Sequence, residues 1–339
     1  MKYKMPAEWA PHERTFIEWP VKASLVYSDN YKEVCEGYAE VIRAISKFEP
    51  VTVIVNSDDV PLAKTFCGNA AEFEVIEHND AWCRDNGPTF VYDETGNRVG
   101  VDWQFNAWGE KYTPYDLDDA MAGTLLERLK IQRLRAPIIL EGGSIHTDGE
   151  GTLLSTEECL LNPNRNALLN RSAIESILND YLGVTHFIWL KDGLFGDETD
   201  GHIDNVACFA KPGVILIQTC RDPEDPNYAR SRSHLRSLKT ARDAAERKIE
   251  IVEIPQPPAR YYRGERLTLS YLNFYLVNGG LILPVFGGEA SVADEAAEAI
   301  LKRVFEGREI VKIDGMKLIK EGGNVHCITQ QMPVGKEIK

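Results

Sequence analysis

A helix followed by a strand recurs five times along this chain, and this repeat restricts the possible folds more than any other sequence feature. In the first unit, Val34, Tyr38 and Ile42 recur at helical spacing, and the following run VTVIV is rich in β-branched residues, as buried strands are. The pattern predicts helices at residues 31–48, 117–130, 165–182, 228–247 and 291–305, strands after them at residues 51–55, 131–140, 186–190, 249–254 and 309–313, and one earlier strand at residues 15–19 on a sheet edge.

After each unit comes a short phrase containing Gly, Asp or Asn, and successive phrases lie about 50 to 70 residues apart. Two folds fit this spacing. One is a five-bladed, pseudo-symmetric α/β propeller, in which strand-helix-strand units surround a central active site, and the other is a doubly wound α/β sheet. The pattern leaves both open, and the lack of a long linker predicts a single domain over residues 1–339. The phrases are CRDNGPTFV from Cys83, EGGSIHTDG from Glu141, DGHIDNVACF from Asp200, LNFYLVNGG from Leu272 and EGGNVHCIT from Glu321.

Charge and cysteine usage limit the partners and the compartment. A formal net charge of −14 disfavours nucleic acid and anionic membranes and mildly favours a cationic ligand. No run approaches the roughly 18 apolar residues of a spanning helix, and the N-terminus has no signal-peptide core. Seven cysteines without CxxC pairs indicate free thiols, so we expect a cytoplasmic protein. A homo-oligomer is compatible with the sequence, which does not specify the oligomeric state.

The phrase EGGNVHCIT presents the best candidate nucleophile, Cys327, directly after two glycines. Neighbouring side chains on an extended segment point to opposite faces, so we expect the base that serves Cys327 to come from elsewhere than His326. The related phrase EGGSIHTDG has Thr147 at the thiol position. We therefore expect His146 and His326, which occupy the same place in the two phrases, to be structural.

His202 and Asp204 are two residues apart on what the pattern predicts to be a strand, which would place both side chains on one face. An isolated pair of this kind is also common at solvent-exposed strand entrances. If the five units close into a ring, however, the phrase that holds His202 meets the one that holds Cys327.

Three other phrases supply polar side chains that also have ordinary structural explanations. Asp85 could cap a turn and Glu141 could be a surface carboxylate, although a carboxylate beside an imidazole would favour its charged form. Asn273 lies among aromatic residues, where packing and turn formation are the commoner roles, and it is also a candidate substrate-binding residue. No zinc or dinucleotide signature is present, so we expect neither a metal nor a cofactor.

The motifs WCRDNGPTFV, EGGSIHTDGEGTLLSTEECLLNPNRN, GHIDN and EGGNVHCITQQ together resemble those of the agmatine deiminases and the related Porphyromonas-type peptidylarginine deiminases, and the likeness covers essentially the whole chain. The chain departs from many relatives at Glu321, where they have glycine. The resemblance implies the five-bladed α/β propeller of the guanidine-modifying enzymes. It also implies the following site: Cys327 as nucleophile, His202 as general acid and base, Glu141 as the partner of that histidine, Asp85 and Asp204 as guanidinium ligands, and Trp82 in the pocket wall.

The substrate implied by the resemblance is a guanidine, and residues 102–112 favour agmatine. Relatives that act on C-terminal arginine hold its carboxylate with arginines in this region, whereas here the only cation is Lys111. Trp103 and Trp108 are expected to cover the methylene chain. The products would be ammonia and N-carbamoylputrescine, on the way to putrescine. The alternatives are conversion of peptidyl or free arginine to citrulline, a Cys–His amidase, and a non-catalytic guanidine sensor.

Overall fold

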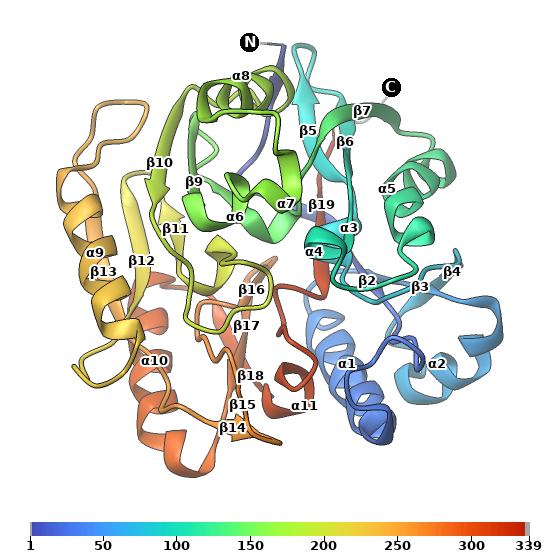
Figure 1. Ribbon diagram of the computed structural model, residues 1–339. Coiled ribbons are helices and arrows are strands. Elements are labelled where there is room, and N and C mark those ends of the chain that lie inside the picture. Colours follow the sequence, from blue (N-terminus) through green and yellow to red (C-terminus); the bar gives the residue numbers. More distant parts are fainter. Residues whose placement is uncertain (1, 336–339) are drawn as a thin grey trace.

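The computed structural model describes residues 2–335, and within them the long helices lie at the periphery with the strands between them (Figure 1). The helices of two or more turns are α1 (Tyr31–Ile45), α2 (Val60–Cys67), α5 (Asp116–Leu129), α8 (Arg171–Leu182), α9 (Asn227–Thr240) and α10 (Ser291–Val304). One-turn helices are α3 (Cys83–Asn86), α4 (Ala107–Glu110), α6 (Glu157–Leu160), α7 (Pro163–Asn166) and α11 (Met316–Ile319).

The strands of this mixed α/β fold repeat one local topology, in which an antiparallel pair is extended by a parallel strand reached through a helix. Four sheets follow it along the chain: β5 (Thr89–Asp93), β6 (Arg98–Gln104) and β7 (Gln132–Ile139); β8 (Ile145–Thr147), β9 (Thr152–Thr156) and β10 (His186–Leu190); β11 (Ala207–Lys211), β12 (Val214–Thr219) and β13 (Glu250–Pro255); β16 (Tyr275–Val277), β17 (Gly280–Val285) and β18 (Glu309–Asp314).

One sheet of the same kind joins the two ends of the described chain. In it, β19 (Thr329–Pro333) pairs antiparallel with β2 (His12–Glu18), and β2 pairs parallel with β3 (Val51–Val55) and so leads to β4 (Glu72–Val75). The short strand β1 (Tyr3–Lys4) adds to β5, and β14 (Tyr261–Tyr262) pairs with β15 (Glu265–Arg266) in a small hairpin. The chain ends therefore meet in one sheet.

The five predicted helix-then-strand units are confirmed, with three corrections. The helix predicted at 165–182 is broken, because the Asn170 side chain accepts a hydrogen bond from the amide of Ala173 and begins α8 there. The helix predicted at 228–247 ends at Thr240. The strand predicted on an edge, β2, lies between β19 and β3, because its neighbour β19 comes from the far end of the chain.

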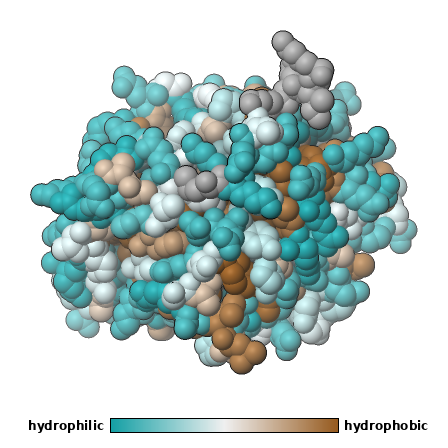
Figure 2. Space-filling view, turned by 90° about the horizontal axis from the view of Figure 1, so that it is seen from above, coloured by the Kyte–Doolittle hydropathy of each residue, from teal (hydrophilic) through white to brown (hydrophobic). Residues whose placement is uncertain are grey.

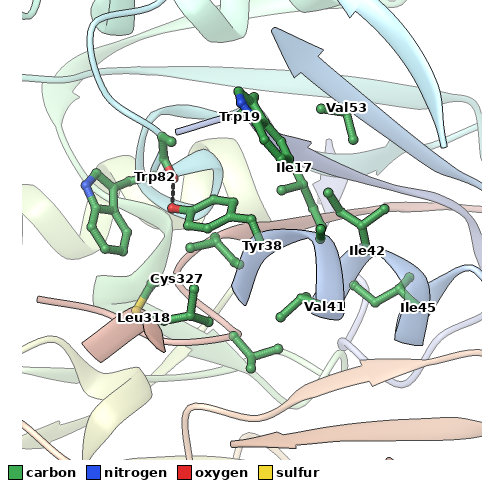
Figure 3. Packing of buried hydrophobic residues seen from close by; sticks show 14 of the residues in the cluster. Ile17, Trp19, Tyr38, Val41, Ile42, Ile45, Val53, Trp82, Leu318 and Cys327 are labelled. Carbon is green, nitrogen blue, oxygen red and sulfur yellow. Dashed lines mark hydrogen bonds between the residues drawn. The ribbon is translucent and has the colours of Figure 1, made fainter. Parts of the chain in front are cut away.

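The largest apolar cluster connects α1 to the candidate nucleophile. Val34, Tyr38, Val41, Ile42 and Ile45 on α1 are buried because they recur on one face of the helix, and that face packs on β3 and Ile17. Figure 3 shows this packing, with the Tyr38 hydroxyl donating a hydrogen bond of 2.9 Å to the carbonyl of Ala81. Cys327 belongs to the same cluster, so the core supports the site directly.

Hydrophilic side chains cover most of the face seen in Figure 2, and apolar side chains form smaller areas between them. Among the described helices, none combines the length and the apolar character that crossing a membrane requires.

Replacing Ile42 by Ala tests the importance of this cluster. Ile42 is fully buried, so we expect urea unfolding to show a loss of ~2–5 kcal/mol in the free energy of unfolding. The control is Lys32→Ala on the exposed side of α1, which should change stability by less than ~0.5 kcal/mol. Equal effects of the two substitutions would contradict the packing described above.

Candidate active site

Cys327 lies in a turn just before β19, not on the extended segment expected from the sequence. The turn forms because Asn273 binds it from the side: its Oδ1 accepts the amide of His326 at 3.0 Å, and its Nδ2 donates to Cys327 Sγ at 3.1 Å. The preceding Gly323 leaves room for the thiol, since a Cβ there would lie 3.1 Å from Sγ and 2.4 Å from the Trp82 ring. Asn273 therefore holds the nucleophile.

His202 and Asp204 do not lie on a strand, which corrects the expectation that period-two alternation brings them together. A 3-10 helix, Ile203–Asn205, begins directly after His202 and carries Asp204 into the interior. The amide of His202 donates to Thr199 Oγ1 at 3.2 Å, which fixes the start of this turn. Both side chains are buried and reach the same site through turn geometry.

Asp85 is carried by the short helix α3, where the sequence suggested a turn. Its Oδ1 accepts the amide of Gly143 at 3.0 Å and its Oδ2 accepts the indole N–H of Trp108 at 2.9 Å. Gly143 is the point on which the polar groups converge: a Cβ there would lie 2.6 Å from His202 Nδ1, 2.8 Å from Asp85 Oδ1 and 3.1 Å from Asp204 Oδ2. Only glycine can fill this position without moving those groups.

His202 is enclosed by acidic and sulfur-containing side chains. Its Nδ1 lies 3.7 Å from Asp85 Oδ1 and its Nε2 lies 3.9 Å from Glu141 Oε2, beyond hydrogen-bond distance. Burial disfavours the imidazolium, but the Asp85 charge and contacts with Cys159 and Glu141 outweigh it and raise the pKa of His202 well above its ordinary value. These neighbours favour the imidazolium form of His202, although neither of its ring nitrogens has a hydrogen-bond partner among the described residues.

Glu141 is buried and ionised. Burial favours its neutral form, but the Arg165 guanidinium, 2.6 Å away, and His202 lower its pKa below the ordinary value. Glu141, Cys159 and His202 place one potential metal-binding atom each within 4.8 Å of one another. Carboxylate, thiol and imidazole suit Zn²⁺, but Arg165 already balances the charge of Glu141. The set therefore fits a Glu–His pair better than a cation site.

A pocket of about 30 Å³ opens beside Cys327. Its apolar wall includes Trp82, Trp108 and Tyr38, and its polar wall is acidic. Among the described residues that line it, none is lysine or arginine. The nearby Lys111 ammonium is bound instead to the carbonyl of Glu198 and to Asp200 Oδ1. The acidic lining residues are Asp80, Asp85, Glu198 and Glu321.

Three of these acids, Asp80, Glu198 and Glu321, interact with one another and were missed in the sequence. Burial raises the pKa of Asp80 to about 6, and burial likewise raises the pKa values of Glu198 and Glu321. The Tyr112 hydroxyl donates to Glu198 Oε2 at 2.6 Å. Apart from Glu321, these residues lie outside the glycine-containing phrases, although Glu198 precedes His202 by only four positions and could have been considered with it.

The structure brings Asp85, Glu141, His202, Asp204 and Cys327 together, and it places Trp82 and Trp108 in the pocket wall. Trp103 does not lie where it was expected to cover a substrate: with Val99 and Val101 it is on the face of β6 that packs into another core cluster, and its indole N–H donates to Thr89 Oγ1 at 3.0 Å. Asn273 contacts the Cys327 thiol, and its expected contact with substrate stays a prediction.

His326, expected to be structural, bridges two carboxylates. Its Nδ1 lies 3.0 Å from Asp204 Oδ2 and its Nε2 lies 2.8 Å from Glu8 Oε1. The expectation that Cys327 does not pair with it agrees with these contacts. The same Asp204 oxygen lies 3.5 Å from Cys327 Sγ.

Comparison with known proteins identifies a single family. Residues 4–333 match the model of the Porphyromonas-type peptidyl-arginine deiminase family. The agmatine deiminase of Pseudomonas aeruginosa (strain LESB58) is 44% identical, with 99% of this chain and 96% of that protein covered. The agmatine deiminase of Stutzerimonas stutzeri (strain A1501) is 44% identical, with 98% and 95% covered. A solved agmatine deiminase of Enterococcus faecalis superposes with a TM-score of 0.92 at 34% identity, with 98% of this chain and 96% of that one covered.

The titration of Cys327 provides a test of this geometry. Burial and the charges of Asp204 and Asp85 raise the pKa of the thiol well above its ordinary value in the empty site. We therefore expect the rate of alkylation by iodoacetamide to rise with pH only in the alkaline range. Asp204→Asn removes one of those charges and should move the midpoint to lower pH, whereas Asp58→Asn on the surface should not. Identical profiles for all three proteins would contradict the assignment.

Proposed function

The chain belongs to the Porphyromonas-type peptidyl-arginine deiminase family, and we propose that it hydrolyses agmatine to N-carbamoylputrescine and ammonia. The observation that carries this proposal is a pocket lined by the Cys327 thiol and by acidic side chains, with no lysine or arginine among the described residues that line it. His202 lies directly behind this lining, with Nδ1 3.7 Å from Asp85 Oδ1. A substrate that is cationic at both ends suits such a pocket. The named relatives are agmatine deiminases.

Asp85 and Asp204 bind the guanidinium group. A guanidinium is planar, stays protonated at any cellular pH and offers N–H donors in a fixed fork that carboxylates match. Asp204 is ionised, because His326 and His202 outweigh the effect of burial and lower its pKa, and its Oδ1 is buried without a hydrogen-bond partner. A buried, unpartnered carboxylate oxygen requires a donor, and the substrate supplies it.

The acidic cluster Asp80, Glu198 and Glu321 receives the amine at the other end of agmatine. A bound ammonium would return these carboxyl groups to their charged form, reversing the effect of burial on their pKa values. An arginine substrate would instead bring an α-carboxylate toward the same acids. Lys111, the one cation expected in this region, cannot serve that carboxylate while it is bound to Glu198 and Asp200.

The first half-reaction transfers the amidine carbon to Cys327. The guanidinium places a positive charge beside the thiol and offsets the two carboxylates that raise its pKa, so the thiolate forms when substrate binds. Sulfur attacks the central carbon and a C–S bond forms. His202 gives its proton to one nitrogen, the C–N bond breaks, and ammonia leaves an S-alkylthiouronium on Cys327.

The second half-reaction uses the now neutral His202 as a base. It takes one proton from a water molecule that attacks the same carbon. The C–S bond then breaks, the added oxygen becomes the ureido carbonyl and loses its remaining proton to solvent, where the released ammonia takes it up, and Cys327 returns as thiolate beside imidazolium. Glu141 stabilises that imidazolium and is itself held by Arg165. These steps use residues of this chain alone.

Three further expectations belong to this proposal. The five sheets with repeated topology are the blades of a five-bladed α/β propeller in which β19 and β2 close the ring. The chain is a single domain whose core clusters adjoin one central site. All seven cysteines are free, which suits the cytoplasm, where thiols stay reduced.

Incubation with agmatine, free arginine and an arginine-containing peptide tests the function. We expect ammonia and ureido product from agmatine, with kcat/KM for the other two at least ~100-fold lower because their carboxylate or carbonyl groups face the acidic cluster unpaired. Cys327→Ser should release no ammonia from any of them. Comparable turnover of arginine or peptide would overturn the substrate, and ammonia release by Cys327→Ser would overturn the mechanism.

Gly143→Ala tests whether the polar groups of the site must approach residue 143 closely. The added methyl group would displace His202 and Asp85, so we expect kcat/KM for agmatine to fall at least ~100-fold. Gly335→Ala, where a Cβ meets only ordinary contacts near 3.5 Å, is the matched control and should leave kcat/KM and the melting temperature unchanged. A fully active Gly143→Ala enzyme would contradict the geometry.

A further inference from the structure

A buried chain of three side chains links the N-terminal segment to the site. Glu8, in the loop between β1 and β2, lies 2.8 Å from His326 Nε2, and His326 Nδ1 lies 3.0 Å from Asp204 Oδ2. All three side chains are more than 90% buried. Both ring nitrogens of His326 thus face a carboxylate, which is the arrangement of an imidazolium that donates twice.

The charges of Glu8, His326 and Asp204 stabilise one another. Burial and the Arg84 guanidinium disfavour a charge on His326, but Glu8 and Asp204 outweigh them and raise its pKa. Burial favours neutral Glu8, but His326, His146 and Arg84 outweigh it and lower its pKa well below the ordinary value. Glu8 is thus an anion that keeps His326 a cation.

Asp204 depends on that cation for its orientation. One of its oxygens, Oδ2, is occupied by His326, which leaves Oδ1 as the unpartnered oxygen. The same Oδ2 is near Cys327 Sγ at 3.5 Å. A rotated or protonated Asp204 would present a different edge to a guanidinium and a different charge to the thiol.

Glu8 is placed independently of His326. Its main-chain carbonyl accepts a hydrogen bond of 2.8 Å from His12 Nε2, and His12 Nδ1 is held by Glu49 at 2.9 Å. The backbone at Glu8 is therefore fixed, and it places the Glu8 carboxylate beside His326.

We propose that Glu8 is a positioning residue for guanidinium binding: it holds His326 as an imidazolium, and His326 fixes the ionised Asp204 carboxylate toward the substrate. This inference rests on the proposed function for its substrate, and it extends the site to a residue that touches neither substrate nor thiol. Other titratable groups that interact with Glu8, His326 or Asp204 are Arg84, Asp85, His146, Asp197, His202, Cys208, Tyr275 and Cys327.

Glu8→Gln keeps the size of the side chain and removes its charge. We expect KM for agmatine to rise about tenfold or more, with a smaller fall in kcat, because substrate binding loses a fixed carboxylate. The acid limb of kcat/KM should move to higher pH. The pKa of Asp204 is held low in the folded site, and the ionised carboxylate is lost as the pH falls through that pKa. Losing the His326 imidazolium raises the pKa of Asp204, so the carboxylate is lost at a higher pH. His326→Gln should give the same changes.

The matched control is Asp102→Asn, which removes the charge of another buried, ion-paired carboxylate, bound by Arg133 and Arg135 away from the site. It should alter the melting temperature without altering KM or the pH profile. A KM and acid limb in Glu8→Gln that match the wild type, or equal changes in Asp102→Asn, would overturn the proposal.

A readout without substrate separates this inference from the proposed function. Loss of the His326 charge leaves Asp204 uncompensated beside Cys327, so the alkylation midpoint of Cys327 should move to higher pH in Glu8→Gln, whether or not agmatine is the substrate. If neither variant folds, nitrogen-15 histidine spectra of the wild type decide: both ring nitrogens of the histidine contacting Glu8 and Asp204 should remain protonated at pH 8. A neutral ring there, or an unchanged alkylation midpoint, would overturn the proposal.

Discussion

The mutual compensation of buried charges is the constraint on which this site depends. A carboxylate in a protein interior is costly unless a cation or several donors face it, and a site that collects several of them must supply partners for each. Here Glu141 has Arg165 and His202, and Asp204 has His326. This compensation is incomplete within the site, because Asp204 Oδ1, Glu141 Oε2 and both ring nitrogens of His202 have no hydrogen-bond partner among the described residues.

This compensation also explains how one thiol can be unreactive without substrate and reactive with it. Burial and the charges of Asp204 and Asp85 raise the pKa of Cys327 well above its ordinary value. A cation between those carboxylates reverses their effect on the thiol, so binding and activation draw on the same electrostatic interaction. An uncharged molecule that entered the pocket would leave the thiol protonated.

The five helix-then-strand units could be predicted from periodicity, because they differ little from their local preferences, but the antiparallel pair that begins each of four sheets, such as β5 with β6, could not. The predictions of local structure are wrong where tertiary contacts override those preferences. Residues 203–205 form a 3-10 helix where the pattern predicted a strand. The Cys327 turn forms because Asn273, 54 positions earlier, accepts its amides. Side chains alternate regularly between the two faces of β6, but the sequence of β6 alone does not tell which face meets the pocket. Trp103 lies on the other face, in a core cluster.

Glu8 could not have been found by the same reasoning, since it precedes His326 by 318 positions and belongs to no motif. Its position follows from the pairing of β2 with β19, which brings the first and last strands of one sheet together. The amide of Arg84 also donates to the carbonyl of Cys327, at 3.2 Å, so three distant segments fix one turn. The nucleophile, the cation that orients Asp204 and the carboxylate that charges this cation are thus assembled only when both ends of the described chain are in place. A partly folded chain that has not paired β2 with β19 would lack Glu8 beneath His326, and its Asp204 would lose the orienting contact even with the other sheets formed.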